Sequence, residues 1–281
     1  MTHRVPQRAL VALGNLAYLR RPPVKLAICA IFRDEARHLP EWIVFHRLLG
    51  VERFYLYDNR STDDWRTALA PELADGVVEV IDWPHSRGQL SAFADCLERH
   101  RTDTRWIAFI DIDEFLFSPT GRSLPDVLHE FRTWPGVAVN SRYFGIGGWE
   151  DPPDGLVTES YFMSDAGETG LIKSIVDPLR TLRADSSHHF AYEYGLAVDE
   201  NEWPLPGAQT RSTSFERLRI NHYASRSEED VRAKVGRAGS WNHLAPWRMR
   251  DLEGELDLVR DETIARYVPA LRAALAEVEA R

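Results

Sequence analysis

Two aspartates, one residue apart, follow a hydrophobic run near the middle of the chain. The run is Trp106-Ile-Ala-Phe-Ile110, and Asp111-Ile-Asp113-Glu-Phe115 comes directly after it. Side chains alternate along an extended strand, so this pattern predicts Asp111 and Asp113 on one side of the chain. Two carboxylates in that arrangement can hold a hard divalent cation that keeps open positions for diphosphate oxygens. Aspartates are also common in caps and turns, so a structural role is the alternative.

Three more groups of polar residues follow predicted strands earlier in the chain. They are Arg33-Asp34-Glu35, then Asp58-Asn-Arg-Ser-Thr-Asp63, then Asp82-Trp-Pro-His-Ser-Arg87-Gly-Gln89. Taken singly, each has an ordinary explanation as a helix cap or a turn. Taken together, they would line one cleft with acceptors, donors and one cation, which suits a nucleotide better than an apolar ligand.

The polar groups lie between hydrophobic runs and amphipathic stretches that alternate along the first half of the chain. Strands are predicted over Lys25–Phe32, Arg53–Tyr57, Val77–Ile81 and Arg105–Ile110. Helices are predicted between them over Pro40–Leu49, Asp63–Leu73 and Gln89–His100. This alternation predicts an α/β fold with a doubly wound, mostly parallel, Rossmann-like sheet and C-terminal helices. Such sheets bind ligands at the carboxyl ends of their strands, where all four polar groups stand.

The second half is less regular. A helix is predicted over Ser123–Arg132, a strand over Val137–Tyr143 and a Gly/Pro-rich loop over Phe144–Gly155. From Ser225 the chain is expected to be helical, with Ser227 and Asp230 at capping-box spacing. The chain is expected to comprise a basic segment 1–24, a domain 25–240 with a first half (25–120) that binds the nucleotide and a second half (121–240), and a C-terminal helical extension 241–281.

The composition indicates a folded domain and argues against a nucleic-acid partner. The 281 residues are 44% hydrophobic and 27% charged, with a formal net charge of −9. An acidic body repels a polyphosphate backbone unless it carries a basic stripe, and none is found. For an anionic substrate, a metal cation is the expected counter-charge. Cys29 and Cys96 are interpreted as core residues in a reducing compartment.

The first 25 residues carry five basic side chains and no acidic one. The apolar run Ala9–Leu19 within them is too short to span a bilayer and is not followed by a signal-peptide cleavage site. Two alternatives remain: a short helix packed on the domain, or peripheral contact with the anionic inner face of a membrane. We expect a cytoplasmic protein in either case.

An ordered series of motifs extends this interpretation. It comprises Phe32-Arg-Asp-Glu-Ala-Arg-His-Leu-Pro-Glu-Trp-Ile-Val-Phe-His46, Leu49-Gly-Val51, Tyr55-Leu-Tyr-Asp-Asn-Arg-Ser-Thr-Asp63, Gln89-x-x-Ala92-x-x-Asp95-Cys96, Trp106-Ile-Ala-Phe-Ile-Asp-Ile-Asp-Glu-Phe115, Phe144-Gly145, Lys173-Ser-Ile-Val176 and Asn221-His-Tyr223. Over about residues 25–240 the series resembles glycosyltransferase family 92, also called the DUF23 group, which is close to the family 2 enzymes with the GT-A fold.

The resemblance implies roles for the residues that match its motifs. Asp58 matches the acid that binds the nucleobase, and Asp111 matches the acid near the ribose. Asp113 matches the acid that binds Mn²⁺ or Mg²⁺ bridging the diphosphate. Asp34 and Glu35 stand where family members usually have Asn-Glu, at a nucleotide contact.

Four further positions complete the predicted donor site. Arg87, Gln89 and Lys173 are predicted to contact the nucleotide sugar, although Lys173 could equally be a solvated strand residue. His222 stands where GT-A enzymes often supply a late metal or diphosphate ligand. His188 and His189 are alternatives for that role, and a purely structural histidine is the ordinary explanation.

The implied activity is a metal-dependent transfer of a sugar from a nucleotide-sugar donor, expected to be a UDP-sugar. The acceptor would be a hydroxyl group of a glycan or a lipid-linked molecule. An inverting transfer needs a carboxylate to deprotonate that hydroxyl, and Glu150 and Asp151 are the candidates. Trp149 would stack on a sugar ring beside them. A solvated acidic loop with Trp149 packed inward is the alternative.

Two other functions are weighed against this one. A sugar nucleotidyltransferase would carry a Gly-rich phosphate loop after the first strand, whereas Phe32-Arg-Asp-Glu35 contains no glycine. A non-catalytic carbohydrate-binding or partner-binding domain would be expected to lose its acids, but Asp58, Asp111 and Asp113 are all present. The transferase is therefore preferred.

Overall fold

The computed structural model describes residues 22–167, 169–238, 251 and 253–280. Residues 1–21, on which the predicted membrane contact depends, lie outside this part of the chain, as do residues 239–250. No helix in the described ranges is both long enough and apolar enough to cross a membrane.

The elements have the following bounds. The strands of the main sheet are β1 (Val24–Phe32), β2 (Arg53–Asp58), β3 (Val78–Asp82), β4 (Thr104–Phe109), β5 (Glu114–Phe117), β6 (Gly136–Tyr143), β8 (Ile172–Val176), β11 (Ala197–Val198), β12 (Pro204–Leu205) and β13 (Arg219–His222). Two small pairs are β9 (Thr181–Ala184) with β10 (Phe190–Tyr192), and β7 (Met163–Asp165) with β14 (Leu258–Arg260). The helices are α2 (Leu39–Leu48), α3 (Trp65–Ala68), α4 (Ala70–Ala74), α5 (Gln89–Arg99), α6 (Leu124–Leu128), α7 (Val157–Ser160), α8 (Glu228–Ala238) and α10 (Val268–Glu279), with 3-10 turns at His129–Phe131, Pro178–Arg180 and Thr263–Tyr267.

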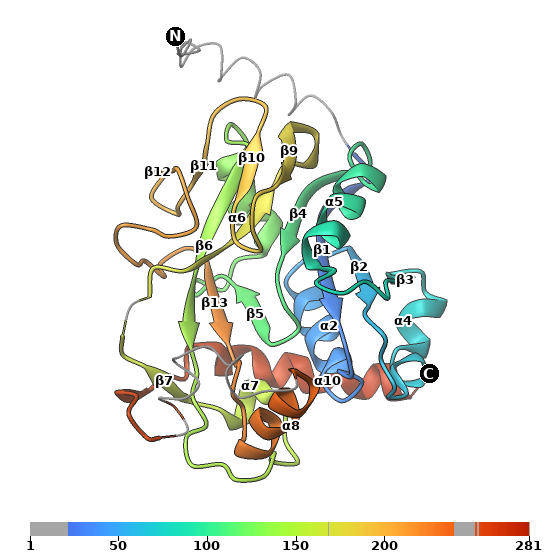
Figure 1. The fold of residues 1–281 in the computed structure, drawn as a ribbon, viewed down its shortest axis with the longest axis vertical. Coiled ribbons are helices and arrows are strands. Elements are labelled where there is room, and N and C mark those ends of the chain that lie inside the picture. Colours follow the sequence, from blue (N-terminus) through green and yellow to red (C-terminus); the bar gives the residue numbers. More distant parts are fainter. Residues whose placement is uncertain (1–21, 168, 239–250, 252, 281) are drawn as a thin grey trace.

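The main sheet has the order β12-β11-β6-β8-β4-β1-β2-β3, and β13 pairs with β5 and β6 beside it (Figure 1). Strands β3, β2, β1 and β4 are mutually parallel, whereas β8 runs antiparallel to both β4 and β6. The predicted doubly wound, mostly parallel sheet is confirmed. The four strands predicted in the first half are present, with ends within one residue of those predicted.

Helices cover both faces of this sheet because the side chains of its strands alternate. Leu26 and Ile28 of β1 belong to one hydrophobic core with residues of α2 and with Leu271 of α10. Ala27 and Cys29 belong to a second core, together with residues of α5. Cys29 and Cys96 are free, buried thiols, as predicted.

Two predicted helices are interrupted. The helix expected over Asp63–Leu73 is divided into α3 and α4, and Pro71 lies at the start of α4. Proline has no N–H to donate and tolerates only the first turn of a helix, so it favours this break. The helix expected over Ser123–Arg132 ends as a 3-10 turn after α6.

The C-terminal part begins as predicted but does not stay helical. Ser227 Oγ accepts a hydrogen bond from the Asp230 amide at 3.1 Å, which caps the start of α8. The expectation of continuous helix from Ser225 is wrong, because β14 pairs with β7 before α10 begins. Helix α10 then packs beside α2 (Figure 1), with Phe45 and Tyr267 ring centroids 5.8 Å apart. The division of the chain into domains stays a prediction.

Candidate active site

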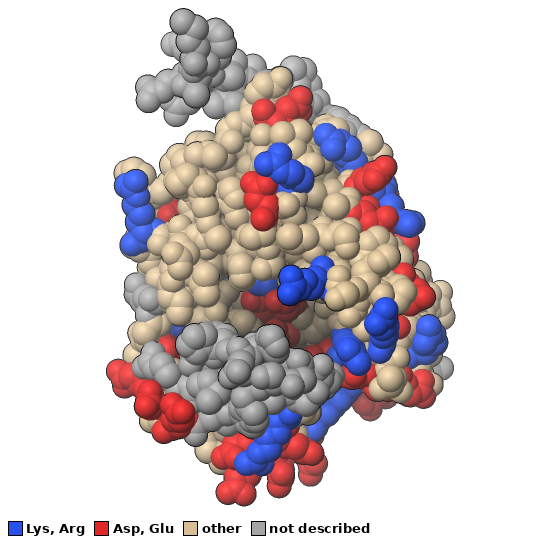
Figure 2. Space-filling view, viewed as in Figure 1, with Lys and Arg blue, Asp and Glu red and all other residues tan. Residues whose placement is uncertain are grey.

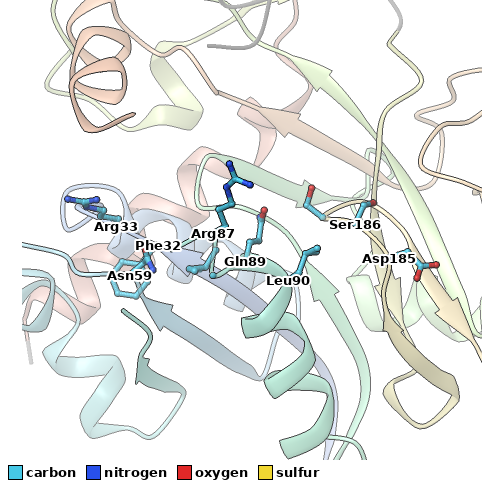
Figure 3. Close-up of a pocket in the computed structure, with 11 residues that line it drawn as sticks. Phe32, Arg33, Asn59, Arg87, Gln89, Leu90, Asp185 and Ser186 are labelled. Carbon is cyan, nitrogen blue, oxygen red and sulfur yellow. The ribbon is translucent and has the colours of Figure 1, made fainter. Parts of the chain in front are cut away.

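A cleft of about 690 Å³ lies at the carboxyl ends of β1, β2 and β3. It is lined by Ile31, Phe32, Arg33, Asn59, Arg87, Gly88, Gln89, Leu90, Asp185, Ser186 and Ser187. Figure 3 shows Arg87 and Gln89 in its middle, with Arg33 and Asn59 at one end and Ser186 and Asp185 at the other. Figure 2 shows a hollow on this face with acidic side chains at its floor. The predicted position of the site, at the ends of the parallel strands, therefore coincides with a cleft.

Backbone strain is concentrated in the loops near this edge. Five non-glycine residues of the described chain have positive φ, and four of them follow β1, β2, β3 and β13. These four are Asp34 (φ 54°), Arg60 (φ 65°), Arg87 (φ 54°) and Arg226 (φ 58°). A left-handed backbone is unfavourable for such residues and is found preferentially at functional sites.

The loops after β1 and β2 are joined through Ser61. The Asp34 amide donates to Ser61 Oγ at 3.0 Å, and the Ser61 amide donates to Asp58 Oδ1 at 2.9 Å. Asp58 is buried, and its second oxygen accepts from Trp65 Nε1 at 3.2 Å. Asp34 Oδ1 accepts from the Thr62 amide at 2.7 Å. Asp34 and Asp58 therefore shape this end of the cleft, and their predicted nucleotide contacts stay predictions.

Asp111 lies in a buried charged group on the other side of the cleft. The antiparallel register of β4 and β8 pairs Phe109 with Ser174, which brings Lys173 next to Asp111. Lys173 Nζ lies 2.6 Å from Asp111 Oδ2 and 3.3 Å from Glu114 Oε2, while Gln89 Nε2 donates to Asp111 Oδ1 at 2.9 Å. Burial alone would lower the pKa of Lys173, but the two carboxylates outweigh it and raise this pKa.

The contact between Lys173 and Asp111 places this lysine behind the carboxylate. The Lys173 side chain is 3% exposed, whereas that of Asp111 is 34% exposed. Asp111 is thus the member of the pair that reaches solvent, and Lys173 holds it from behind. The predicted contact between Lys173 and the donor stays a prediction.

The extended backbone assumed for the aspartate pair is not observed. Strand β4 ends at Phe109, and the Glu114 amide donates to the Asp111 carbonyl at 3.1 Å, so Asp111–Asp113 forms a turn between β4 and β5. Ile112, between the two aspartates, is buried. The turn gives the two aspartates different partners: Asp111 contacts Lys173, whereas Asp113 contacts groups delivered by β13 and α8.

Asp113 is surrounded by basic side chains from the C-terminal part of the domain. The register of β13 on β5 pairs His222 with Glu114, and His222 Nε2 lies 3.5 Å from Asp113 Oδ1. Lys234 Nζ of α8 lies 2.8 Å from Asp113 Oδ2. Burial alone would raise the pKa of Asp113, but Lys234 and His222 outweigh it and hold this pKa well below its usual range.

Asp113 and His222 are suited to share a divalent cation. Within the described residues, no group of three or more His, Cys, Asp or Glu side chains is placed to hold a metal ion. Mg²⁺ typically uses only one or two carboxylates, together with substrate phosphates and water. The donor set therefore fits a cation that a diphosphate completes, provided that Lys234 leaves Asp113 Oδ2.

The other two candidate histidines have different partners. His188 Nδ1 lies 2.8 Å from the Ile172 carbonyl, and His189 Nδ1 lies 3.7 Å from Asp185 Oδ2. Of the three candidates, His222 contacts an aspartate of the predicted pair. Its predicted role toward a metal or diphosphate stays a prediction.

Several residues of this site were not predicted from the sequence. Arg226 is buried, and its Nη1 lies 3.3 Å from Glu35 Oε2, while its Nε and Nη2 have no hydrogen-bond partner among the described residues. Burial, reinforced by the charge of Arg226, lowers the pKa of His38 to about 2, so this imidazole is neutral. Arg226, His38, Lys234 and Glu114 all contact or influence residues that lie far away in the sequence. The sequence did predict a helix that starts after Ser225, close to Arg226 and Lys234. A predicted helix start does not tell which residues these two side chains contact.

Glu150 and Asp151 lie on an exposed loop. The amides of Glu228 and Glu229 donate to the carbonyls of Trp149 and Glu150 at 3.1 and 3.0 Å. The loop is therefore attached to the first turn of α8, the helix that carries Lys234 to Asp113. Trp149 is 40% exposed and is not packed inward.

Replacing Lys173 with methionine is expected to lower the free energy of unfolding by roughly 3 to 5 kcal/mol, because it leaves the buried Glu114 carboxylate without its cation. Chemical denaturation monitored by circular dichroism measures this. Lys25→Met, at an exposed position at the start of β1, is the control and should change little. An unfolding free energy equal to that of the wild type would show that Lys173 does not stabilise the group.

The fold and the site define a class: an α/β protein with a doubly wound sheet and an acidic ligand site at its strand ends. The model of glycosyltransferase family 92 matches residues 23–260, and the chain belongs to this family. The resemblance inferred from the motifs is confirmed.

Two curated relatives from plants belong to the same family. A family 92 protein of Ricinus communis is 33% identical over 244 residues, covering 84% of this chain and 41% of the relative. One from Oryza sativa subsp. japonica is 34% identical over 183 residues, covering 63% of this chain and 31% of the relative. The chain thus spans less than half the length of these relatives.

The solved structures that this chain resembles have lower sequence identity to it than the curated relatives do. Staphylococcus aureus TarS residues 1–349 in complex with UDP has a TM-score of 0.38 and 12% identity, over 55% of this chain and 47% of that one. Mycobacterium tuberculosis glucosyl-3-phosphoglycerate synthase with Mn²⁺ and UDP-glucose has a TM-score of 0.31 and 19% identity, over 50% and 49% of the two chains.

Proposed function

We propose that this protein transfers a hexose from a UDP-sugar to a hydroxyl group of a glycan or lipid-linked acceptor, with Mn²⁺ or Mg²⁺ and with inversion. The observation that carries the proposal is the position of acidic side chains directly at the ends of two parallel strands, at the edge of the sheet where the cleft lies. Asp58, Asp111 and Asp113 come from the ends of β2 and β4, and Asp111 bonds Gln89 of the cleft wall.

Membership of family 92 supports transfer chemistry, and the names of three relatives support a hexose. Two galactan β-1,4-galactosyltransferases of Arabidopsis thaliana are 28% and 30% identical over 106 and 102 residues. A β-1,4-galactosyltransferase of Caenorhabditis elegans is 32% identical over 120 residues. Each covers about a third of the chain. UDP-galactose is therefore the first donor to test.

In this proposal different residues bind different parts of the donor. Asp111, held by Gln89 and Lys173, accepts a hydrogen bond from a ribose hydroxyl. Arg87 supplies a guanidinium in the cleft for the phosphates. Asp113 and His222 hold the cation, which neutralises the charge of the departing diphosphate.

The acceptor hydroxyl needs a base on the face of the sugar opposite the departing diphosphate. Glu150 and Asp151 are the proposed candidates. The bonds from α8 to the carbonyls of Trp149 and Glu150 support this, because they attach the loop to the helix that contacts Asp113. Exposed Trp149 offers a ring face for a sugar.

UDP and the divalent cation are expected to bind together, each raising the affinity for the other, because the cation completes its ligands with diphosphate oxygens. Calorimetric titration of UDP with Mn²⁺, and again with a chelator, measures this. Uridine, which lacks the diphosphate, is the control and should bind equally in both. Equal UDP affinity with and without the cation would remove the bridging metal from the proposal.

A panel of nucleotide sugars, with and without Mn²⁺, tests the function itself. Metal-dependent release of UDP from one donor, enhanced by a hydroxyl acceptor, supports the transferase. Formation of nucleotide sugar from sugar phosphate and nucleoside triphosphate would identify a nucleotidyltransferase instead. Binding of carbohydrate without turnover of any donor would identify a binding domain.

A further inference from the structure

The Lys234 ammonium contacts Asp113, the residue that is predicted to bind the metal. Its ammonium lies 2.8 Å from Asp113 Oδ2 and donates to the Ala224 carbonyl at 2.9 Å. The two side chains are 13% and 12% exposed, so solvent screens this pair only partly. The lysine charge is thus placed on the carboxylate that the proposed function assigns to the cation.

A divalent cation and the Lys234 ammonium cannot share Asp113 at low cost. Like charges a few ångströms apart repel strongly in a partly buried site. The nearby acids face other basic groups: Glu35 contacts Arg226, and the buried Glu114 contacts Lys173 and His222. His222, on the opposite oxygen of Asp113, is a suitable partner for a cation only when it is neutral.

We infer that Lys234 is an exchangeable counter-ion: it neutralises Asp113 before the donor binds, and it moves to the diphosphate when the divalent cation takes its place. This inference rests on the proposed function. It makes the binding of metal and donor mutually dependent, because a cation that binds alone displaces the ammonium from the Asp113 carboxylate and brings it no anion in return. A diphosphate supplies that anion.

The side chain is built for such a movement. A lysine ammonium is a compact charge on a flexible four-carbon stem, and it binds phosphate as a point charge. The start of α8 is fixed by the Ser227 cap and by the backbone bonds to the 149–150 loop. The lysine can therefore change rotamer while its helix stays in place.

Calorimetric titration with Mn²⁺, without nucleotide and with saturating UDP, tests the inference on Lys234→Met. Methionine retains the length of the side chain and suits a helix. In the wild type, UDP should raise the Mn²⁺ affinity strongly. In the variant, the affinity for Mn²⁺ alone should rise at least about tenfold, since one opposing charge is gone, and the enhancement by UDP should shrink by a similar factor.

Two further variants act as controls. Arg232→Met removes a positive charge from the 63% exposed Arg232 of the same helix and should leave both affinities unchanged. Lys234→Arg retains the charge and should keep the dependence on UDP. Thermal melting of every variant establishes that it is folded.

The outcomes separate this inference from the proposed function. If the folded Lys234→Met protein binds Mn²⁺ alone no better than the wild type, the exchange is wrong even where UDP and Mn²⁺ bind together. If the wild type binds neither UDP nor UDP with Mn²⁺, the proposed function fails first. A rise in the affinity for Mn²⁺ alone with Arg232→Met equal to that of Lys234→Met would reduce the effect to net charge and overturn the inference.

Discussion

Replacing Asp113 with asparagine is expected to reduce sugar transfer roughly a hundredfold to a thousandfold while the protein stays folded. An amide is a much weaker ligand for a hard cation than a carboxylate, and losing one group that stabilises a departing charge typically costs this much in turnover. Asparagine has nearly the same shape, and the Lys234 ammonium keeps its bond to the Ala224 carbonyl. Steady-state release of UDP, compared with the melting temperature, measures both parts.

Two other substitutions of aspartate by asparagine serve as comparisons for Asp113→Asn. Asp111→Asn should be milder and should raise KM more than it lowers kcat, since its proposed partner is a ribose hydroxyl. Asp75→Asn, at an exposed position at the end of α4, should leave transfer unchanged. Wild-type turnover by a folded Asp113→Asn protein would show that Asp113 does not hold a cation that transfer needs.

Removing the general base is expected to slow transfer roughly a hundredfold or more, the usual contribution of proton abstraction by a positioned carboxylate. Glu150→Gln and Asp151→Asn are the two variants to compare, and one of them should show the loss. Donor affinity should stay near that of the wild type, because the proposed nucleotide contacts lie in the cleft lined by Arg87 and Gln89. Single-turnover transfer and calorimetric binding of the donor measure the two quantities separately.

Asp154→Asn is the matched control for this loop, because Asp154 is also exposed and lies a few residues further on. It should transfer sugar at the wild-type rate. Wild-type rates for both Glu150→Gln and Asp151→Asn would exclude both candidates as the base. NMR of the product tests the stereochemistry independently, and a product with the donor's anomeric configuration would reject inversion.

The local sequence determined most of the nucleotide-binding half. Hydrophobic runs such as Lys25–Phe32 are typical of strands buried on both faces, and a parallel sheet aligns the carboxyl ends of such strands. The polar groups after β1, β2, β3 and β4 were therefore expected at one edge, and the structure places a cleft there. The Ser227 cap was predicted for the same reason: capping depends on residues only three positions apart.

The partners of the aspartates were decided by the tertiary structure alone. Lys234 lies 121 positions from Asp113, and Arg226 lies 191 positions from Glu35. These contacts depend on the register of β13 on β5 and on the direction in which α8 leaves that strand. Hydrophobic periodicity predicts neither the register nor the direction of the helix. It indicates which face of an element is buried and not which distant element covers that face. The turn at Asp111–Asp113 has the same cause, since the pairing of β5 with β13 draws the chain away from the line of β4 directly after Phe109.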